Sequence, residues 1–350
     1  MSEDFLMLLD EFEKEKGISR NVLIEALETA LVSAYKKNYG ARHNVRVEIN
    51  RLNGGMNVYI QKTVVAEVED PLTQISLAEA KAINPIYEEE DIVEEETVPQ
   101  TFGRIAAQTA RQVVTQRIRE AERGIIYNEF ISKENDIITG IVQRVEKRNV
   151  MVDIGKTEAI LTPQEQAPTE MYKNGQRVKV YVVEVQNTTK GPQITISRTH
   201  PGLVRRLFEL EVPEIQNGTV EIKSIAREAG SRTKIAVLSS DPNVDPIGAC
   251  VGPKGARVQK IVDELKGEKI DIIKYSENVP EYVSAALAPA KALSARADEE
   301  SKICSVTVAG HQLSLAIGKE GQNARLAAKL TGWKIDIIKS EGDEAEKDEA

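Results

Sequence analysis

Two short glycine-bounded segments hold the residues of this 350-residue chain that are best suited to chemistry. Gly252-Pro253-Lys254-Gly255 follows Val251, Gly318-Lys319-Glu320-Gly321 follows Ile317, and each segment opens an expected helix. A glycine lets another backbone come close because no Cβ intervenes. The helix that follows offers unpaired N–H groups and the positive end of its dipole. This combination suits a phosphodiester chain and predicts single-stranded RNA as the ligand.

The two loops differ in charge. The first carries Lys254, whereas the second sets Lys319 beside Glu320, whose carboxylate repels phosphate. We therefore expect the second loop to hold RNA more weakly or in a different way. Including the first helical turns, the predicted RNA-binding residues are Val251, Gly252, Pro253, Lys254, Gly255, Arg257, Lys260, Ile317, Gly318, Lys319, Glu320, Gly321, Gln322, Asn323 and Arg325.

The loops belong to a repeated unit. The strings that recur at nearly one offset are Val-Pro-Glu (residues 212 and 279), Gly-x-x-Gly (252 and 318) and Lys-Ile-Asp-Ile-Ile-Lys (269 and 334). Each copy reads strand, short helix, Gly-x-x-Gly, helix, strand, which is the pattern of a KH domain. The connection between Lys274 and Val279 is short, so we expect the copies to pack together. A P-loop is excluded because its Gly-x-x-x-x-Gly-Lys-Ser/Thr pattern is absent.

Residues 136–200 predict a small β-barrel. Five short runs of alternating apolar residues are separated by turns, which suits a Greek-key barrel of the OB type. OB folds commonly stack bases on exposed aromatic side chains, and Tyr172 and Tyr181 are the candidates here. Arg144, Lys147 and Arg148 are weaker RNA candidates that would form a basic lip. A structural spacer with little RNA affinity remains the alternative.

The first 132 residues predict an α/β domain. Apolar stripes indicate helices over residues 3–16 and from Ser19 onward, and alternation indicates strands over 45–49 and 58–64. Ser76 begins a short helix that ends before Pro85. The glutamate-rich run 88–96 indicates a solvated acidic edge. A long, charge-rich helix over 101–132 then serves as a rigid connector.

The charge is distributed unevenly. The net charge of −9 separates into −8 over residues 1–130, +2 over 131–200, +2 over 201–340 and −5 over the last ten. An RNA-binding surface must therefore depend on local groups in the middle of the chain. The acidic first domain favours a protein partner instead.

Signals for other function classes are missing. His43, His200 and His311 are isolated, no metal-ligand spacing occurs, and Cys250 and Cys304 lie in apolar contexts typical of buried thiols in a reducing compartment. No secretory signal or membrane-length apolar run is present. The sequence thus predicts a cytoplasmic RNA-binding protein without a catalytic centre, metal or cofactor.

The order of domains and three strings resemble one family. The similarity is to the NusA family of bacterial transcription factors, and it is found in residues 5–24 with 30–37, in Ser-Arg-Thr-His-Pro at 197–201 and in Val-Asp-Pro-Ile-Gly-Ala-Cys-Val-Gly at 244–252. The resemblance implies an S1-type barrel and a first domain that docks on RNA polymerase near the RNA exit channel. Nascent RNA would meet the other domains, so that pausing, termination and antitermination are modulated, with other elongation or antitermination factors as further partners. It implies a multidomain α+β chain with domains at 1–132, 133–200, 201–276 and 277–340 and an acidic tail at 341–350.

A second class of function stays open at this point. KH and OB modules also occur in ribonucleases and ribosomal proteins, so an RNA-processing or ribosome-assembly accessory is the alternative. Phosphorolytic ribonucleases, however, need a large catalytic core, which an acidic first domain of about 130 residues does not provide. The first domain therefore discriminates between the two functions.

Overall fold

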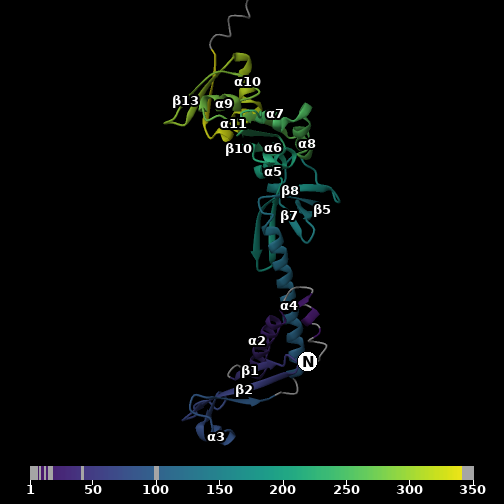
Figure 1. Cartoon of the computed structure of the whole chain (residues 1–350), viewed down its shortest axis with the longest axis vertical. Helices are drawn as coiled ribbons and strands as arrows, with labels where there is room; N and C mark the ends of the chain where they lie inside the picture. The colour runs from purple at the N-terminus through teal and green to yellow at the C-terminus, as the bar shows by residue number, and fades with distance from the viewer. Residues whose placement is uncertain are drawn as a thin grey trace, which may run out of the picture. The chain divides into compact units, whose positions relative to one another are not determined.

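The computed structural model describes residues 7, 9–11, 13, 14, 19–40, 43–97 and 102–340, and Figure 1 labels its elements. The chain divides into two compact units, residues 1–126 and residues 127–350. Most of the helix expected over residues 3–16, and all of the acidic tail at 341–350, lie outside the described residues. None of the described helices is long and apolar enough to cross a membrane.

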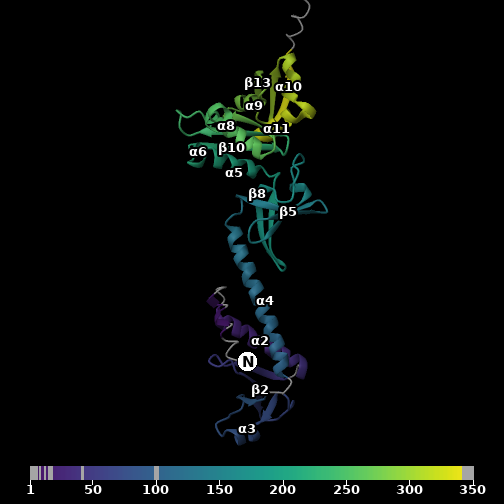
Figure 2. The ribbon, with the colours of Figure 1, turned by 90° about the vertical axis from the view of Figure 1, so that its right-hand side faces the viewer.

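The core of the first unit lies between two helices and a sheet (Figure 2). Leu23, Leu27 and Leu31 recur at helical spacing and are buried, which confirms the apolar stripe expected for this segment. Val45, Val47 and Ile49 alternate with exposed residues along the first strand, as expected. The elements are helices α2 (Arg20–Tyr39) and α4 (Phe102–Ile131) and the antiparallel strands β1 (Asn44–Ile49) and β2 (Met56–Val65).

The far end of β2 carries a small extension. Strand β3 (Gln74–Ser76) pairs with β2 in parallel and β4 (Ile92–Glu96) pairs with it antiparallel. Helix α3 (Leu77–Ile83) begins as the sequence predicts, because the Ser76 hydroxyl accepts from the Glu79 amide and the Glu79 carboxylate accepts from the Ser76 amide. The glutamates of the run 88–96 are exposed, as expected for a solvated acidic edge. Residues 92–96 also form a strand, because pairing with β2 overrides the low strand preference of consecutive glutamates.

The second unit begins with a closed barrel. Its strand order is β5-β6-β7-β9-β8, and β7 and β9 are the parallel pair that closes it. The five expected strands are therefore confirmed, and the core is made of aliphatic side chains such as Val152, Leu161 and Ile196. The strands are β5 (Ile137–Glu146), β6 (Asn149–Asp153), β7 (Glu158–Leu161), β8 (Arg177–Thr188) and β9 (Gly191–Ser197), with a 3-10 turn η1 (Pro163–Glu165) after β7.

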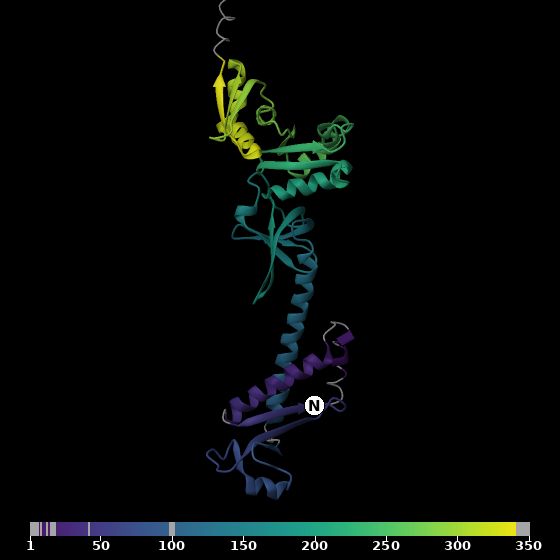
Figure 3. The same ribbon diagram turned by 60° about the vertical axis from the view of Figure 1, so that its left-hand side comes forward.

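Two copies of one three-stranded fold follow the barrel. In each copy the first two strands are antiparallel and the last strand joins the second in parallel. In Figure 3, α5 runs along the first of these sheets. The first copy contains α5 (Pro201–Glu211), α6 (Pro213–Gln216), β10 (Val220–Glu228), β11 (Arg232–Ser239), α7 (Pro246–Val251), η2 (Pro253–Gly255), α8 (Ala256–Glu264) and β12 (Lys269–Lys274). The second contains α9 (Val279–Ala286), β13 (Ala292–Asp298), β14 (Ile303–Val308), η3 (Gly310–Gln312), α10 (Leu313–Ile317), η4 (Lys319–Gly321), α11 (Gln322–Thr331) and β15 (Lys334–Lys339).

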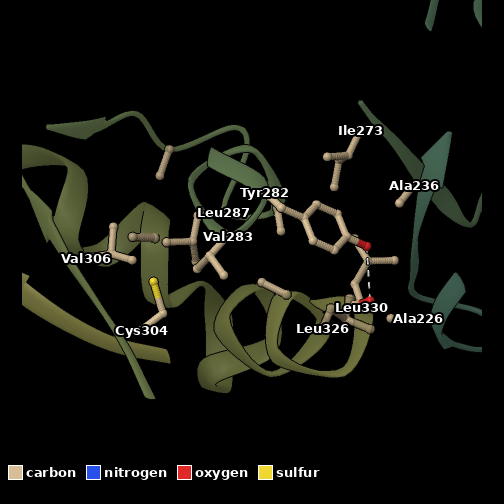
Figure 4. Packing of buried hydrophobic residues seen from close by; sticks show 14 of the residues in the cluster. Ala226, Ala236, Ile273, Tyr282, Val283, Leu287, Cys304, Val306, Leu326 and Leu330 are labelled. Carbon is tan, nitrogen blue, oxygen red and sulfur yellow. Dashed lines mark hydrogen bonds between the residues drawn. The ribbon is translucent and has the colours of Figure 1, made fainter. Parts of the chain in front are cut away.

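The two copies share one hydrophobic core (Figure 4). Ala236 and Ile273 from the first copy lie in the same buried cluster as Tyr282 and Leu326 from the second. The Tyr282 hydroxyl donates to the carbonyl of Leu330 at 3.1 Å and lies 2.6 Å from the hydroxyl of Ser224 in the first copy. The copies therefore pack as one body, as the short connection between them predicts.

Candidate nucleic-acid interface

The two Gly-x-x-Gly loops have almost the same backbone. The φ angles at the first, third and fourth positions are 72°, 52° and 78° in the loop Gly252–Gly255, against 78°, 54° and 73° in the loop Gly318–Gly321. Glycine suits the left-handed region at the outer positions. The third position is Lys254 or Glu320, which raises the energy of each loop by about 1 kcal/mol or more. Both copies thus hold the same strained turn between two helices.

A free ammonium group stands on each loop. Lys254 and Lys319 are exposed, and neither forms an ion pair with any residue that the structure describes. Glu320 beside Lys319 is also exposed. Each loop directly precedes a helix of nine or ten residues, and the N-terminal end of such a helix attracts anions. This geometry can hold a phosphodiester backbone.

The basic side chains beyond the loops are paired within the protein. Arg257 donates to Glu214 at 2.9 Å and to the carbonyl of Ala249 at 2.6 Å. Lys260 donates to Glu211 at 3.0 Å, although its side chain is two-thirds exposed. The residues expected to bind RNA therefore fall into two groups, the loop lysines without partners and the helix cations with acidic partners.

In the second copy the side chains after the loop point to other parts of the protein. The Asn323 amide is 3% exposed and donates to the carbonyls of Leu287 and Ala316 at 2.9 and 3.1 Å. Gln322 and Arg325 both donate to Glu228 of the first copy at 2.8 Å. Hydrogen bonding to Glu228 raises the pKa of Arg325. The apolar residues before the loops differ, since Val251 is half-buried and Ile317 is exposed.

The second loop opens onto a cavity that both copies line. The cavity has a volume of about 320 Å³. Gly318, Lys319 and Gln322 line it from the second copy, and Arg232 and Lys269 line it from the first. Arg232 is held by Asp271 at 2.7 Å, which leaves Lys269 and Lys319 as the exposed cations of this cavity. The second loop is thus part of a surface that continues into the first copy.

The barrel contributes a basic hairpin tip but no aromatic platform. Lys147 and Arg148 form the two-residue turn between β5 and β6, with φ angles of 48° and 71°, and both are exposed. Arg144 is paired with Glu146 and Glu158 at 2.6 and 2.8 Å. The basic lip expected from the sequence is therefore reduced to the turn itself.

The two tyrosines considered for base stacking both make contacts within the protein. Tyr181 is 6% exposed and its ring stacks on His200 with centroids 4.6 Å apart. Tyr172 donates to Glu170 at 2.9 Å, and burial raises the pKa of its hydroxyl. Tyr181 therefore lacks the exposed ring face that OB folds use for stacking, which corrects the expectation for this residue, whereas Tyr172 is half-buried and is held by its hydroxyl.

Arg198 is the residue whose role the sequence did not reveal. Its guanidinium is 1% exposed, donates to Glu170 of the barrel at 2.9 Å and reaches the carbonyl of Glu264 in α8 at 2.9 Å. A third hydrogen bond, 2.8 Å long, goes to the carbonyl of Lys179 in β8. Arg198 therefore fixes the barrel against the first KH copy, and a single arginine in a polar string gives no signal of this long-range role.

The comparison with known proteins decides the family. Models of four domains match in order: the NusA N-terminal domain over residues 4–124, the S1 RNA binding domain over 132–197, the NusA-like first KH domain over 198–275 and the NusA-like second KH domain over 279–345. The transcription termination/antitermination protein NusA of Halalkalibacterium halodurans is 62% identical over 99% of this chain and 90% of its own length. The NusA of Bacillus subtilis is 60% identical over 99% of this chain and 93% of its own length. This chain belongs to the NusA family.

Membership of the NusA family confirms the expected fold. The barrel is an S1 RNA-binding domain and the two copies are KH domains of the NusA type. The solution structure of the N-terminal domain of the Bacillus subtilis NusA is 55% identical to the matched part, covering 35% of this chain and 99% of that one with a TM-score of 0.33. Because the first domain itself matches a NusA model, the RNA-processing alternative loses its support. None of the four matched models is a catalytic family.

Proposed function

We propose that this NusA-family chain docks on RNA polymerase through residues 1–132 and contacts nascent single-stranded RNA through its S1 and KH domains. In this way it modulates pausing, termination and antitermination. The names of its relatives and its RNA-binding domains support the proposal. The chain is a non-enzymatic, cytoplasmic factor that needs no cofactor, and other elongation or antitermination factors are further partners.

The pair of matching glycine loops is the observation that carries the proposal. Lys254 and Lys319 stand on backbones of the same strained shape, at the start of helices, without acidic partners among the described residues. A positive group and a helix N-terminus at one place favour phosphate. Two such places in one rigid pair suit a single extended strand, at about four nucleotides for each KH domain.

The division of charge supports separate partners for the two ends of the chain. Residues 1–130 carry a net charge of −8, which repels a phosphate backbone and favours a protein surface. We take the functional parts to be the polymerase-docking domain at 1–132, the S1 domain at 133–200, the KH domains at 201–276 and 277–340, and the acidic tail at 341–350.

Photocrosslinking within a transcription complex tests this function. Polymerase is halted on a template after nascent RNA that carries 4-thiouridine has emerged from it. The full chain is added, the complex is irradiated, and crosslinked peptides are identified by mass spectrometry. We expect crosslinks at residues 251–260 and 317–325. In a control without polymerase, we expect no crosslinks there when the free single-stranded RNA is replaced by double-stranded RNA. Crosslinks confined to residues 1–126 would contradict the proposed division of labour.

A further inference from the structure

One position in each KH copy joins the helices on both sides of the glycine loop. Arg257 and Asn323 each follow the second glycine of their loop by two residues, so they occupy equivalent places in the repeat. Both lie in the first turn of the helix after the loop. Both direct side-chain N–H groups backwards, to carbonyls of the short helix before the loop.

The first copy makes this connection with a charged side chain. Arg257 donates to the carbonyl of Ala249 in α7 at 2.6 Å, and the same nitrogen lies 2.9 Å from the Glu214 carboxylate. Helix α7 ends at Val251, so its last carbonyls lack partners within the helix. Arg257, which follows the loop, donates to one of these carbonyls, that of Ala249. This hydrogen bond joins the helix after the loop to the helix before it.

The second copy makes the same connection with a neutral side chain. Asn323 donates to the carbonyl of Ala316 in α10 at 3.1 Å and to that of Leu287 beyond α9 at 2.9 Å. Because the residue is 3% exposed, RNA does not reach its amide group in this conformation. Charge is therefore dispensable for this connection, whereas a side-chain N–H donor is common to both copies.

The first glycine of each loop is matched to this connection. A Cβ added at Gly252 would come within 2.6 Å of the Arg257 side chain, and one added at Gly318 would come within 2.8 Å of Asn323. The second glycines have no such close neighbour, since a Cβ at Gly255 meets nothing within 4 Å. The first glycine of each loop is thus required for two reasons: its φ angle is left-handed, and a Cβ there would collide with the side chain that makes the connection.

We propose that Arg257 and Asn323 are positioning residues, which hold the two glycine loops in their RNA-binding shape without contacting RNA. This inference rests on the proposed RNA-binding function of the loops. The third loop position is held in the left-handed region in both copies, and a loop without its connection relaxes toward other turns. RNA then has to restore the loop shape on binding, which lowers affinity without removing a phosphate contact.

The dependence of RNA affinity on salt separates a positioning role from a phosphate contact. Each lost phosphate contact flattens the slope of log K against log salt by about 0.7 for a single strand. The full chain and its variants are titrated with a labelled single-stranded RNA of about twenty nucleotides over a series of KCl concentrations. The variants are Arg257→Met, which has no donor, Arg257→Gln, which keeps an N–H donor without charge, and Lys254→Gln as the matched loss of a loop charge.

A positioning role predicts three results. Arg257→Met lowers affinity about tenfold at every salt concentration, the loss expected from one charged hydrogen bond, and its slope equals that of the wild type. Arg257→Gln recovers most of this affinity, again with an unchanged slope. Lys254→Gln flattens the slope by about 0.7. If Arg257→Gln instead flattens the slope as Lys254→Gln does, Arg257 is a phosphate contact and the proposal is overturned.

Replacing Glu214, the acidic partner of Arg257, changes RNA affinity in opposite directions under the two roles. If Arg257 positions the loop, Glu214→Gln removes one of its anchors and RNA binding stays equal or weakens. If Arg257 contacts phosphate, Glu214→Gln releases the arginine, so binding becomes tighter and steeper in its salt dependence. Tighter binding by Glu214→Gln would overturn the proposal.

Hydrogen exchange separates a failure of this inference from a failure of the proposed function. Without RNA, the amides of residues 252 and 254–256 exchange faster in Arg257→Met than in wild type or Arg257→Gln, while β11 and β12 keep their protection. If the wild type binds no single-stranded RNA, the proposed function fails whatever the exchange shows. Unchanged exchange in Arg257→Met, in a chain that binds RNA, defeats the positioning role alone.

Discussion

At the scale of single residues, the two glycine loops differ in where the positive charge stands. The first loop places Lys254 at the third position, where φ is 52°, and the second places Lys319 at the second position with Glu320 at the third. The φ angles of the two loops are nearly equal, so the difference in affinity that we predict must come from side chains. The carboxylate of Glu320 beside Lys319 is expected to weaken the attraction for phosphate at that loop.

Replacing the two inner residues of the first loop with Asp tests this ranking. Pro253→Asp with Lys254→Asp places two carboxylates where phosphate oxygens approach, so we expect most RNA binding to be lost. The slope of log K against log salt falls by about 0.7, since one phosphate contact disappears. The fold stays intact because both side chains are exposed and Asp tolerates the left-handed region at position 254.

The equivalent exchange in the second loop is the matched control. Lys319→Asp with Glu320→Asp causes a smaller loss, because position 320 is already acidic. Circular dichroism and melting temperature verify that both variants are folded. A first-loop variant that binds single-stranded RNA as tightly as the wild type shows that Gly252–Gly255 is only a turn, and equal losses at both loops refute the ranking.

At the scale of elements, sequence periodicity predicts those that alternate clearly and misses those that depend on tertiary pairing. The barrel strands and the helices around both loops are legible in the sequence because each buries one regular face. β13 (Ala292–Asp298) is missed because its side chains are half-buried at best and its one large apolar residue, Leu293, is exposed, and β3 has only three residues. The loop lysines are predictable from local spacing, whereas the internal roles of Arg257 and Asn323 depend on the tertiary positions of carbonyls.

The contact between the barrel and the first KH domain predicts a large effect at Arg198. Arg198→Met leaves the Glu170 carboxylate, 4% exposed, without its buried cation. Breaking one side of such a pair destabilises a protein by about 3–5 kcal/mol. Urea unfolding of residues 127–350 measures the change in the free energy of unfolding.

A second variant keeps this test specific. Arg198→Met with Glu170→Gln removes both charges, so the loss in stability is smaller than for Arg198→Met alone. Equal losses in the single and double variants contradict the assignment of Arg198 and Glu170 as one buried pair.

At the scale of the second unit, the shared core of the KH domains predicts one continuous RNA footprint. The hydroxyl of Tyr282 in the second copy lies 2.6 Å from the hydroxyl of Ser224 in the first, and the buried ammonium of Lys234 donates to the carbonyl of Ala288 in the second copy at 2.6 Å. With about four nucleotides for each KH domain, we expect nuclease protection of roughly eight nucleotides on long single-stranded RNA. Protection that stays at about four nucleotides at saturating protein contradicts a joint surface.

At the scale of the whole chain, we predict that dividing the chain between residues 126 and 127 places polymerase binding and RNA binding on different fragments. This boundary keeps the buried Phe130 and the Glu129–Lys156 ion pair together with the barrel, which a cut at residue 131 would disrupt. Each unit has its own buried core, so we expect both fragments to fold. Residues 1–126 should retain purified RNA polymerase on a column without RNA, and residues 127–350 should bind single-stranded RNA with the affinity of the full chain.

In a transcription assay, neither fragment alone should lengthen pauses as the full chain does, because RNA contact must be held at the polymerase by the first domain. If residues 127–350 alone change pausing as fully as the whole chain at equal concentration, docking through the first domain is unnecessary and that part of the proposed function is wrong.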